Sequence, residues 1–292
     1  MKITTNPFKG PSKLEKQISQ LVPPIGMNYN WGGGKGNYKK EFAKRFTHEI
    51  FPYLLQKSRK LNVSTEEVSF LDIGCGWGPM AVAFVLFEQA FHNDRKDHAR
   101  YLGIDIREDA IGWLSNAYTQ YPFIHFQYHQ ANSNIDYVGA GQNKSNTLVS
   151  SSGEETQYDI PKDFVHNWQW SSSVFTHLTP QACLGALKSI KRSSAKKSMQ
   201  VNTWLIIDEE SRYSLASEAT DRKLPFDCGD FLTYSESNPL MCTCYKIEAI
   251  KRMYKESGLE IVDIDKGSWR GPYYKNKANH YQDIIISRAI NN

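Results

Sequence analysis

Three glycines at alternate positions follow an apolar segment and an aspartate in residues 70–78, which read FLDIGCGWG. The apolar residues predict a buried strand, and the small apolar stretch at residues 79–84 predicts that a helix begins directly after the glycines. Glycine has no Cβ, so a turn containing Gly74, Gly76 and Gly78 lets a ligand approach the backbone closely. We expect the N–H groups at the start of the helix to meet the polar end of that ligand. The segment therefore predicts a nucleotide-binding α/β fold.

The spacing of the glycines distinguishes two protein families that bind nucleotides at a glycine turn between a strand and a helix. A dinucleotide site needs G-x-G-x-x-G, but here the third glycine, Gly78, comes only two residues after Gly76, and Pro79 follows it. This spacing disfavours an NAD-dependent oxidoreductase. The order D-x-G-x-G-x-G, beginning at Asp72, resembles motif I of the class I S-adenosylmethionine-dependent methyltransferases. The resemblance implies S-adenosylmethionine as the cofactor.

Composition narrows the class of protein further. The 292 residues are 40% hydrophobic and 13% aromatic, which predicts a packed core in one large domain or one domain with an appendage. A net charge of +4, with acids and bases mixed along the chain, gives no reason to expect nucleic acid as the main partner. Residues 1–24 lack the apolar run of a secretory signal, and no stretch is long enough to span a membrane. The five cysteines lack the spacing of a zinc framework, so we expect reduced thiols, no metal and a cytoplasmic location.

Segments with strand and helix patterns alternate along the chain. We expect strands at residues 68–73, 100–106, 124–128, 165–171, 199–207, 260–265 and 283–287, and helices at residues 79–91, 108–120, 180–191 and 246–257. This alternation predicts a Rossmann-like, doubly wound sheet of seven mostly parallel strands, the class I methyltransferase fold.

Two further regions flank or interrupt this alternation. Residues 1–60 form an N-terminal extension that ends in an amphipathic lid helix at residues 38–60, before a cofactor-binding domain at residues 61–292. Segments near residues 132–161 and 211–239 are expected to be irregular insertions, and a basic loop is expected at residues 192–197. Long polar loops over a rigid scaffold are where acceptor specificity usually lies.

The second strand ends in an aspartate, Asp105, at the edge of the sheet where ligands of open α/β folds bind. Its carboxylate can accept both ribose hydroxyls of an adenosine; the alternative is a solvated strand-end residue. After the third strand, Asn132 or Gln130 offers a paired donor and acceptor to the adenine, or caps a turn. The resemblance implies cofactor contacts from Asp72, Gly74, Cys75, Gly76, Gly78, Asp105, Ile106, Asn132 and Ser171.

The fourth strand leads into residues 173–178, which read SVFTHL. This motif resembles a signature of bacterial class I methyltransferases associated with sugar and cell-surface polysaccharide modification. Three other segments fit the same group: residues 23–26 with 31–34, residues 267–269, and residues 282–283. One departure is Asn167, which stands where members of the group usually carry an aspartate at the start of the fourth strand.

The catalytic candidate is His177, which we expect nearest the transferred methyl group. A histidine there can take the proton of a hydroxyl acceptor, or it can serve a structural hydrogen bond instead. The acids at residues 208–210 can hold sugar hydroxyls, take a proton or bind a cation, or form a solvated loop. His280 is a further candidate. The aromatic residues of the entry segment either cover the sulfonium or pack in the core: Tyr29, Trp31 and Tyr38.

Together these features predict a methyltransferase that acts on an oxygen of a sugar or another small polar molecule. A nucleic-acid or protein methyltransferase is an alternative. Amino-directed nucleic-acid enzymes carry an Asn/Asp-Pro-Pro-Tyr/Phe turn after the fourth strand, where this chain has residues 171–174, SSSV, although the basic residues 188–197 keep this alternative open. A non-catalytic module that binds S-adenosylmethionine is the other alternative.

Overall fold

The computed structural model describes residues 20–24, 45–91, 99–130, 157–220, 222–275 and 277–290. Its centre is a seven-stranded sheet with the order β3-β2-β1-β4-β5-β11-β10. Neighbouring strands from β3 through β5 pair in parallel, while β11 runs antiparallel to both β5 and β10. The strands are β1 (Ser69–Ile73), β2 (Arg100–Asp105), β3 (Ile124–Tyr128), β4 (His166–Ser171), β5 (Ser194–Trp204), β10 (Leu259–Asp265) and β11 (Asp283–Ala289). The predicted doubly wound sheet is confirmed.

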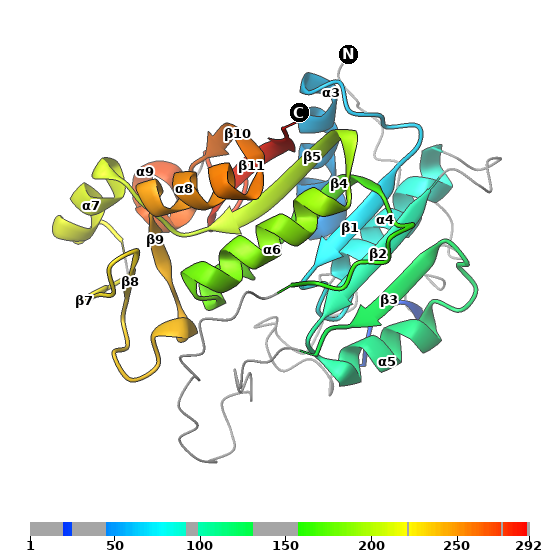
Figure 1. Ribbon diagram of the computed structural model, residues 1–292, viewed down its shortest axis with the longest axis horizontal. Coiled ribbons are helices and arrows are strands. Elements are labelled where there is room, and N and C mark those ends of the chain that lie inside the picture. The colour runs from blue at the N-terminus through cyan, green and yellow to red at the C-terminus, as the bar shows by residue number, and fades with distance from the viewer. Residues whose placement is uncertain are drawn as a thin grey trace.

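Helices cover both faces of this sheet (Figure 1). On one face lie α3 (Phe51–Lys60), α4 (Pro79–Phe91) and α5 (Glu108–Ala117), and on the other lie α6 (Pro180–Arg192) and α8 (Ile247–Ser257). Successive residues of a strand point to opposite faces, so Phe70 packs in the core under α4 and Leu71 in the core under α6. Both faces of the central strands β1, β2 and β4 are therefore buried, as is usual for parallel strands with helices on both sides.

Local sequence sets the ends of these helices. The hydroxyl of Thr179 accepts a hydrogen bond from the N–H of Ala182 and caps α6, whose first residue is Pro180. Gly258, with φ 76°, ends α8 in the left-handed conformation that glycine adopts at low cost. The expected lid helix is described from residue 45 onward. There a π-helical turn, η2 (Phe46–Ile50), precedes α3, and Pro52 stands in the first turn of α3.

The expectation of an irregular segment at residues 211–239 is wrong. The segment contains most of α7 (Glu209–Ala216) and the strands β7 (Phe226–Asp227) and β8 (Phe231–Thr233). With β6 (Ile206–Ile207) and β9 (Cys244–Lys246) these strands form a second sheet of order β6-β9-β8-β7. The strands are too short to show an alternating pattern in the sequence. The expected basic loop is also wrong from residue 194 onward, because β5 begins there.

Four short helices complete the described parts of the chain. They are η3 (Phe175–His177), η4 (Pro239–Met241), η5 (Ser268–Arg270) and α9 (Pro272–Lys275). No helix within the described ranges is long and apolar enough to cross a membrane. Most of the expected entry segment and of the expected insertion at residues 132–161 lies outside the described residues.

Candidate functional site

The glycine loop after β1 is fastened to the end of β2 by its own backbone. The N–H groups of Gly74 and Cys75 both donate to the carbonyl oxygen of Ile104, at 2.8 and 3.1 Å. The N–H of Gly76 donates to Oδ2 of Asp105 at 2.7 Å. The N–H groups of residues 74–76 thus bind the protein itself and fasten the loop to β2. The N–H groups expected to meet a ligand are those at the start of α4, and that expectation remains a prediction.

The three glycines of the loop have different surroundings. A Cβ added at Gly74 would lie 2.3 Å from Cγ2 of Val174, and one added at Gly78 would lie 2.5 Å from Cδ2 of Leu114. At Gly76 an added Cβ would meet no atom of the described residues within 4 Å. All three have positive φ, the conformation that glycine adopts most readily. Gly74 and Gly78 thus permit close packing, whereas Gly76 borders open space that a nucleoside can enter.

Asp105 stands beside this open space and is 9% exposed. Oδ2 holds the N–H of Gly76, and Oδ1 accepts the N–H of Arg107 at 2.9 Å. A carboxylate has about four acceptor positions, and the backbone N–H groups of Gly76, Arg107 and Ile106 act on this one, so acceptor capacity remains for a ribose hydroxyl. Burial raises the pKa of Asp105, while the hydrogen bonds from Gly76 and Arg107 oppose that shift. The residues present therefore fit S-adenosylmethionine, and the alternative of a freely solvated Asp105 is wrong.

Two aromatic side chains near Asp105 were not expected from the sequence. The rings of His129 and Tyr158 lie 4.5 Å apart, and the N–H of His129 donates to the carbonyl oxygen of Asp105. Burial raises the pKa of Tyr158, and the charge of Asp105 adds to that effect. Tyr158 belongs to the polar stretch interpreted as an insertion. Its alternation with the buried Ile160 was the available signal of an ordered segment.

Asp72 and Cys75 lie beneath the loop. Asp72 is buried and accepts a 2.5 Å hydrogen bond from the hydroxyl of Tyr101. Burial raises the pKa of Asp72 to about 7, and the charge of Asp105 contributes. The thiol of Cys75 is also buried, which raises its pKa. Ile106 is half-buried directly after β2. Cofactor contacts from these three residues remain predictions.

The segment after β4 meets the glycine loop through Val174. At the end of β4, the buried hydroxyl of Ser171 donates to Oδ1 of Asn202 at 2.7 Å. The cofactor contact expected of Ser171 remains a prediction. Ser173 has φ 60°, a conformation that is costly for a residue other than glycine. Its N–H donates to Oγ1 of Thr203 at 2.8 Å, which holds the segment in place.

A contact with the short helix η4 holds the ring of His177 in one tautomer. Its Nδ1 lies 3.0 Å from the carbonyl oxygen of Leu240. A carbonyl only accepts, so the proton sits on Nδ1, and Nε2 of the neutral ring carries none. Burial lowers the pKa of His177, which keeps the ring neutral near pH 7. The backbone N–H of His177 also donates to the carbonyl oxygen of Val174, so the main chain of His177 lies one short turn after the residue that contacts the glycine loop.

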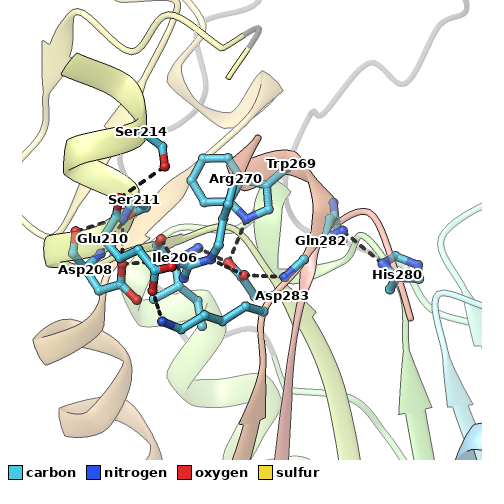
Figure 2. A network of polar contacts seen from close by, with 12 residues as sticks. Ile206, Asp208, Glu210, Ser211, Ser214, Trp269, Arg270, His280, Gln282 and Asp283 are labelled. Carbon is cyan, nitrogen blue, oxygen red and sulfur yellow. Dashed lines mark hydrogen bonds and ion pairs between the residues drawn. The ribbon is translucent and has the colours of Figure 1, made fainter. Parts of the chain in front are cut away.

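His280 has the opposite tautomer. The N–H of Gln282 donates to its Nδ1 at 3.0 Å, so the ring proton sits on Nε2 (Figure 2). Burial lowers the pKa of His280 to about 3. The side chain therefore offers a hydrogen-bond donor rather than a base, and of the two candidate histidines only His177 has a base-competent tautomer.

The predicted acid cluster at residues 208–210 is part of a structural network (Figure 2). Asp208 caps α7 and lies 2.7 Å from Nη1 of the buried Arg270. Glu210 pairs with Lys266. Within the described ranges, no group of three or more His, Cys, Asp or Glu side chains is placed to hold a metal ion. Asp208 is therefore a structural partner of α7 and Arg270, and neither expectation for it, a ligand site or a solvated loop, describes these contacts.

Two other predictions concern residues away from the glycine loop. Asn167 bridges the starts of β1 and β4, since Oδ1 accepts the N–H of Ser69 and Nδ2 donates to the carbonyl oxygen of Glu67. It lies at the amino edge of the sheet, so its departure from the expected aspartate does not alter the candidate site. The predicted adenine contact Asn132 and the entry-segment aromatics lie outside the described residues, and Gln130 is exposed after β3.

The strand order, with β11 reversed, and the glycine turn after β1 define the class I methyltransferase fold. No protein-family model matches the chain, and no curated protein matches it. Similar solved structures include an S-adenosylmethionine-dependent methyltransferase from Clostridium acetobutylicum (TM-score 0.49, 10% identity, covering 85% of this chain and 92% of that one). Another is the magnesium protoporphyrin IX methyltransferase ChlM from Synechocystis PCC 6803 with bound SAH (0.46, 11%, 95% and 95%). A third is the glycopeptide N-methyltransferase MtfA complexed with sinefungin (0.47, 8%, 90% and 91%). These values are too low to transfer an activity or a substrate, so the function must be argued from this chain's own residues.

Proposed function

We propose that this chain is a cytoplasmic S-adenosylmethionine-dependent methyltransferase that acts on an oxygen of a sugar or another small polar acceptor. The observation that carries the proposal is the pairing of Asp105 with the open side of Gly76 at the carboxyl edge of β1 and β2. There Asp105 would hold the ribose, and the missing side chain at Gly76 would let the nucleoside lie against the loop. The bound cofactor would supply an activated methyl group on its sulfonium. The free thiols Cys75, Cys183, Cys228, Cys242 and Cys244 suit a reducing compartment.

In this proposal His177 removes the proton of the acceptor hydroxyl. Its Nε2 is the basic nitrogen, and the carbonyl oxygen of Leu240 stabilises the Nδ1–H of the imidazolium that forms. The protein otherwise acts by positioning, which alone supplies much of the acceleration of a displacement at an activated carbon. The rigid loop and the segment anchored by Val174 hold the two reactants on one framework.

The position of the basic residues disfavours nucleic acid as the substrate. Lys196 and Lys197 are exposed near the start of β5, which is the amino edge of the sheet. The proposed site lies at the opposite, carboxyl edge. A basic surface that served a nucleic-acid substrate would have to lie beside the site. The other alternative is a non-catalytic module that binds S-adenosylmethionine. Such a module would also keep Asp105 and Gly76, so only a measurement of turnover distinguishes it from an enzyme.

Calorimetric titration with S-adenosylhomocysteine, with NADH as the control ligand, tests the proposal. We expect micromolar binding of S-adenosylhomocysteine and no binding of NADH. Asp105→Ala is expected to weaken the binding by about tenfold or more, since hydrogen bonds to a charged group contribute about 1.5–3 kcal/mol each. Asp230→Ala, which removes an exposed partner of Arg252, serves as the matched control and is expected to bind normally. Equal affinity of Asp105→Ala and wild type would refute the assigned site.

A further inference from the structure

Arg222 has a half-buried guanidinium that pairs with no carboxylate of the described residues and acts electrostatically on His177. Arg222 donates from Nε to the hydroxyl of Tyr281 at 3.2 Å and from Nη1 to Sγ of Cys242 at 3.0 Å. Among the residues that the structure describes, no carboxylate pairs with it, and its Nη2 makes no hydrogen bond. Arg270, the other enclosed arginine near β11, is by contrast held by Asp208 and Asp283. Arg222 therefore keeps donors and charge for a ligand.

Arg222 is within electrostatic reach of the proposed base. Burial lowers the pKa of His177, and the positive charge of Arg222 adds to that effect. The hydrogen bond from Cys244 lowers the pKa of Cys242 to about 7, and Arg222 contributes through its charge. The backbone gives the same proximity, because Leu240, which binds His177, lies two residues before Cys242, which binds Arg222.

Two exposed tyrosines lie on the same side of the fold as this cation, and one of them contacts it. The guanidinium lies 5.4 Å from the centre of the Tyr281 ring, which is 38% exposed. Tyr234 is 42% exposed, and the charge of Arg222 acts on its phenol. Arg222 follows α7, Tyr234 follows β8 and Tyr281 precedes β11, so three separate segments bring these side chains together. A cation beside exposed aromatic rings matches a ligand that carries an oxyanion on a ring-shaped body.

We propose that Arg222 binds an oxyanion of the methyl acceptor, a phosphate or a carboxylate, with Tyr281 and Tyr234 beside the body of that molecule. The proposal rests on the proposed function and makes it more specific: the acceptor is an anionic sugar or another small anionic molecule. Binding the oxyanion at Arg222 would place the hydroxyl of the acceptor near Nε2 of His177. The neutral state of His177 then suits a site whose fixed positive charge already belongs to Arg222.

Thermal unfolding of the protein saturated with S-adenosylhomocysteine tests this site. Inorganic phosphate and acetate are added separately, with chloride at equal ionic strength as the reference. One of the two anions is expected to raise the unfolding midpoint of wild type, and which one does so distinguishes a phosphate from a carboxylate. Arg222→Gln is expected to weaken that anion's binding about tenfold or more. Arg252→Gln, the same change at an exposed arginine paired with Asp230, is expected to respond as wild type does.

A second variant guards against a folding defect. Arg222→Lys keeps the charge but loses the planar fork, so an intermediate anion affinity is expected. The proposal fails if neither anion raises the midpoint of wild type, or if Arg222→Gln responds as wild type does. Calorimetry with S-adenosylhomocysteine distinguishes failure of the oxyanion site from failure of the proposed function. Normal cofactor binding without an anion effect overturns the oxyanion site alone. If the protein binds no S-adenosylhomocysteine, the anion titration is repeated without it, and an effect that still depends on Arg222 overturns the proposed function and leaves an anion site that does not serve methyl transfer.

Discussion

Replacing Asp283 with alanine is expected to lower the free energy of unfolding by about 3–5 kcal/mol. Asp283 is fully buried at the start of β11 and accepts hydrogen bonds from the N–H groups of Ile206 and Gly267, from the indole of Trp269 and from Nε of Arg270 (Figure 2). The substitution leaves the guanidinium of Arg270, whose side chain has no exposed surface, with Asp208 as its remaining ion-pair partner. Denaturant unfolding of the two proteins measures the difference.

Two further variants separate loss of the charge pair from loss of a side chain. Glu260→Ala breaks an exposed pair with Arg288 on the same strand pair and is expected to cost less than about 1 kcal/mol. Arg270→Met added to Asp283→Ala removes the buried charge that has lost one of its two carboxylate partners, so the double variant is expected to be more stable than Asp283→Ala alone. If Asp283→Ala costs no more than Glu260→Ala, the buried network does not stabilise the fold as argued.

This network also shows how a sequence can point to the right residues for the wrong reason. Asp208 and Glu210 stand in a run of acids that suggested a ligand site or a solvated loop. The partner of Asp208 is Arg270, 62 residues later in the chain, and no local sequence pattern indicates a contact over that distance. The pairing of Asp208 with Arg270 depends on how η5 and α7 pack around the start of β11. Tertiary contacts of this kind decide whether an acid binds a ligand or another side chain.

The main sheet, in contrast, was predictable because segments with strand patterns alternate with amphipathic helical segments along the sequence. The predicted bounds of α4 and β3 agree with those observed, and Asp105 was predicted where β2 ends. The second sheet was missed because its strands have two or three residues, too few to show a period. Arg222 was also missed, since it stands in a segment whose sequence has the composition of a loop.

The glycine motif predicts the local structure of the loop but not the contacts that the loop makes with β2. Residues 70–78 predicted correctly that strand, turn and helix follow one another, because glycine is needed wherever φ is positive. The motif did not indicate that the N–H groups of Gly74, Cys75 and Gly76 bind Ile104 and Asp105. Those bonds depend on the neighbouring strand, whose alignment with β1 appears only in the folded sheet. They also place the carboxylate of Asp105 close enough to affect Asp72.

Asp72→Asn is therefore expected to stabilise the protein above neutral pH. The pKa of Asp72 is raised to about 7 by burial, with a contribution from Asp105, against about 3.9 in an unfolded chain. Between these values the folded state holds a proton that the unfolded state has released, so stability from this group falls as the pH rises from about 4 to 7. Asparagine is neutral throughout and still accepts the hydrogen bond from Tyr101. At pH 8 the variant is expected to be more stable than wild type by up to about 4 kcal/mol.

The measurement is the difference in unfolding free energy between Asp72→Asn and wild type at pH 5, 6, 7 and 8, which cancels the titration of all other groups. This difference is expected to shift in favour of the variant up to about pH 7 and then to stay constant. Asp263→Asn is the matched control, because its hydrogen bond from Lys57 lowers the pKa of Asp263. Its stabilising effect is present above the unfolded pKa of about 3.9 and is lost only in stronger acid, so this variant is expected to be less stable than wild type by a constant amount from pH 5 to 8. A difference for Asp72→Asn that does not change between pH 5 and 8 would mean that the carboxyl beneath the glycine loop has an ordinary pKa, and that the loop bears no cost for holding two acids together.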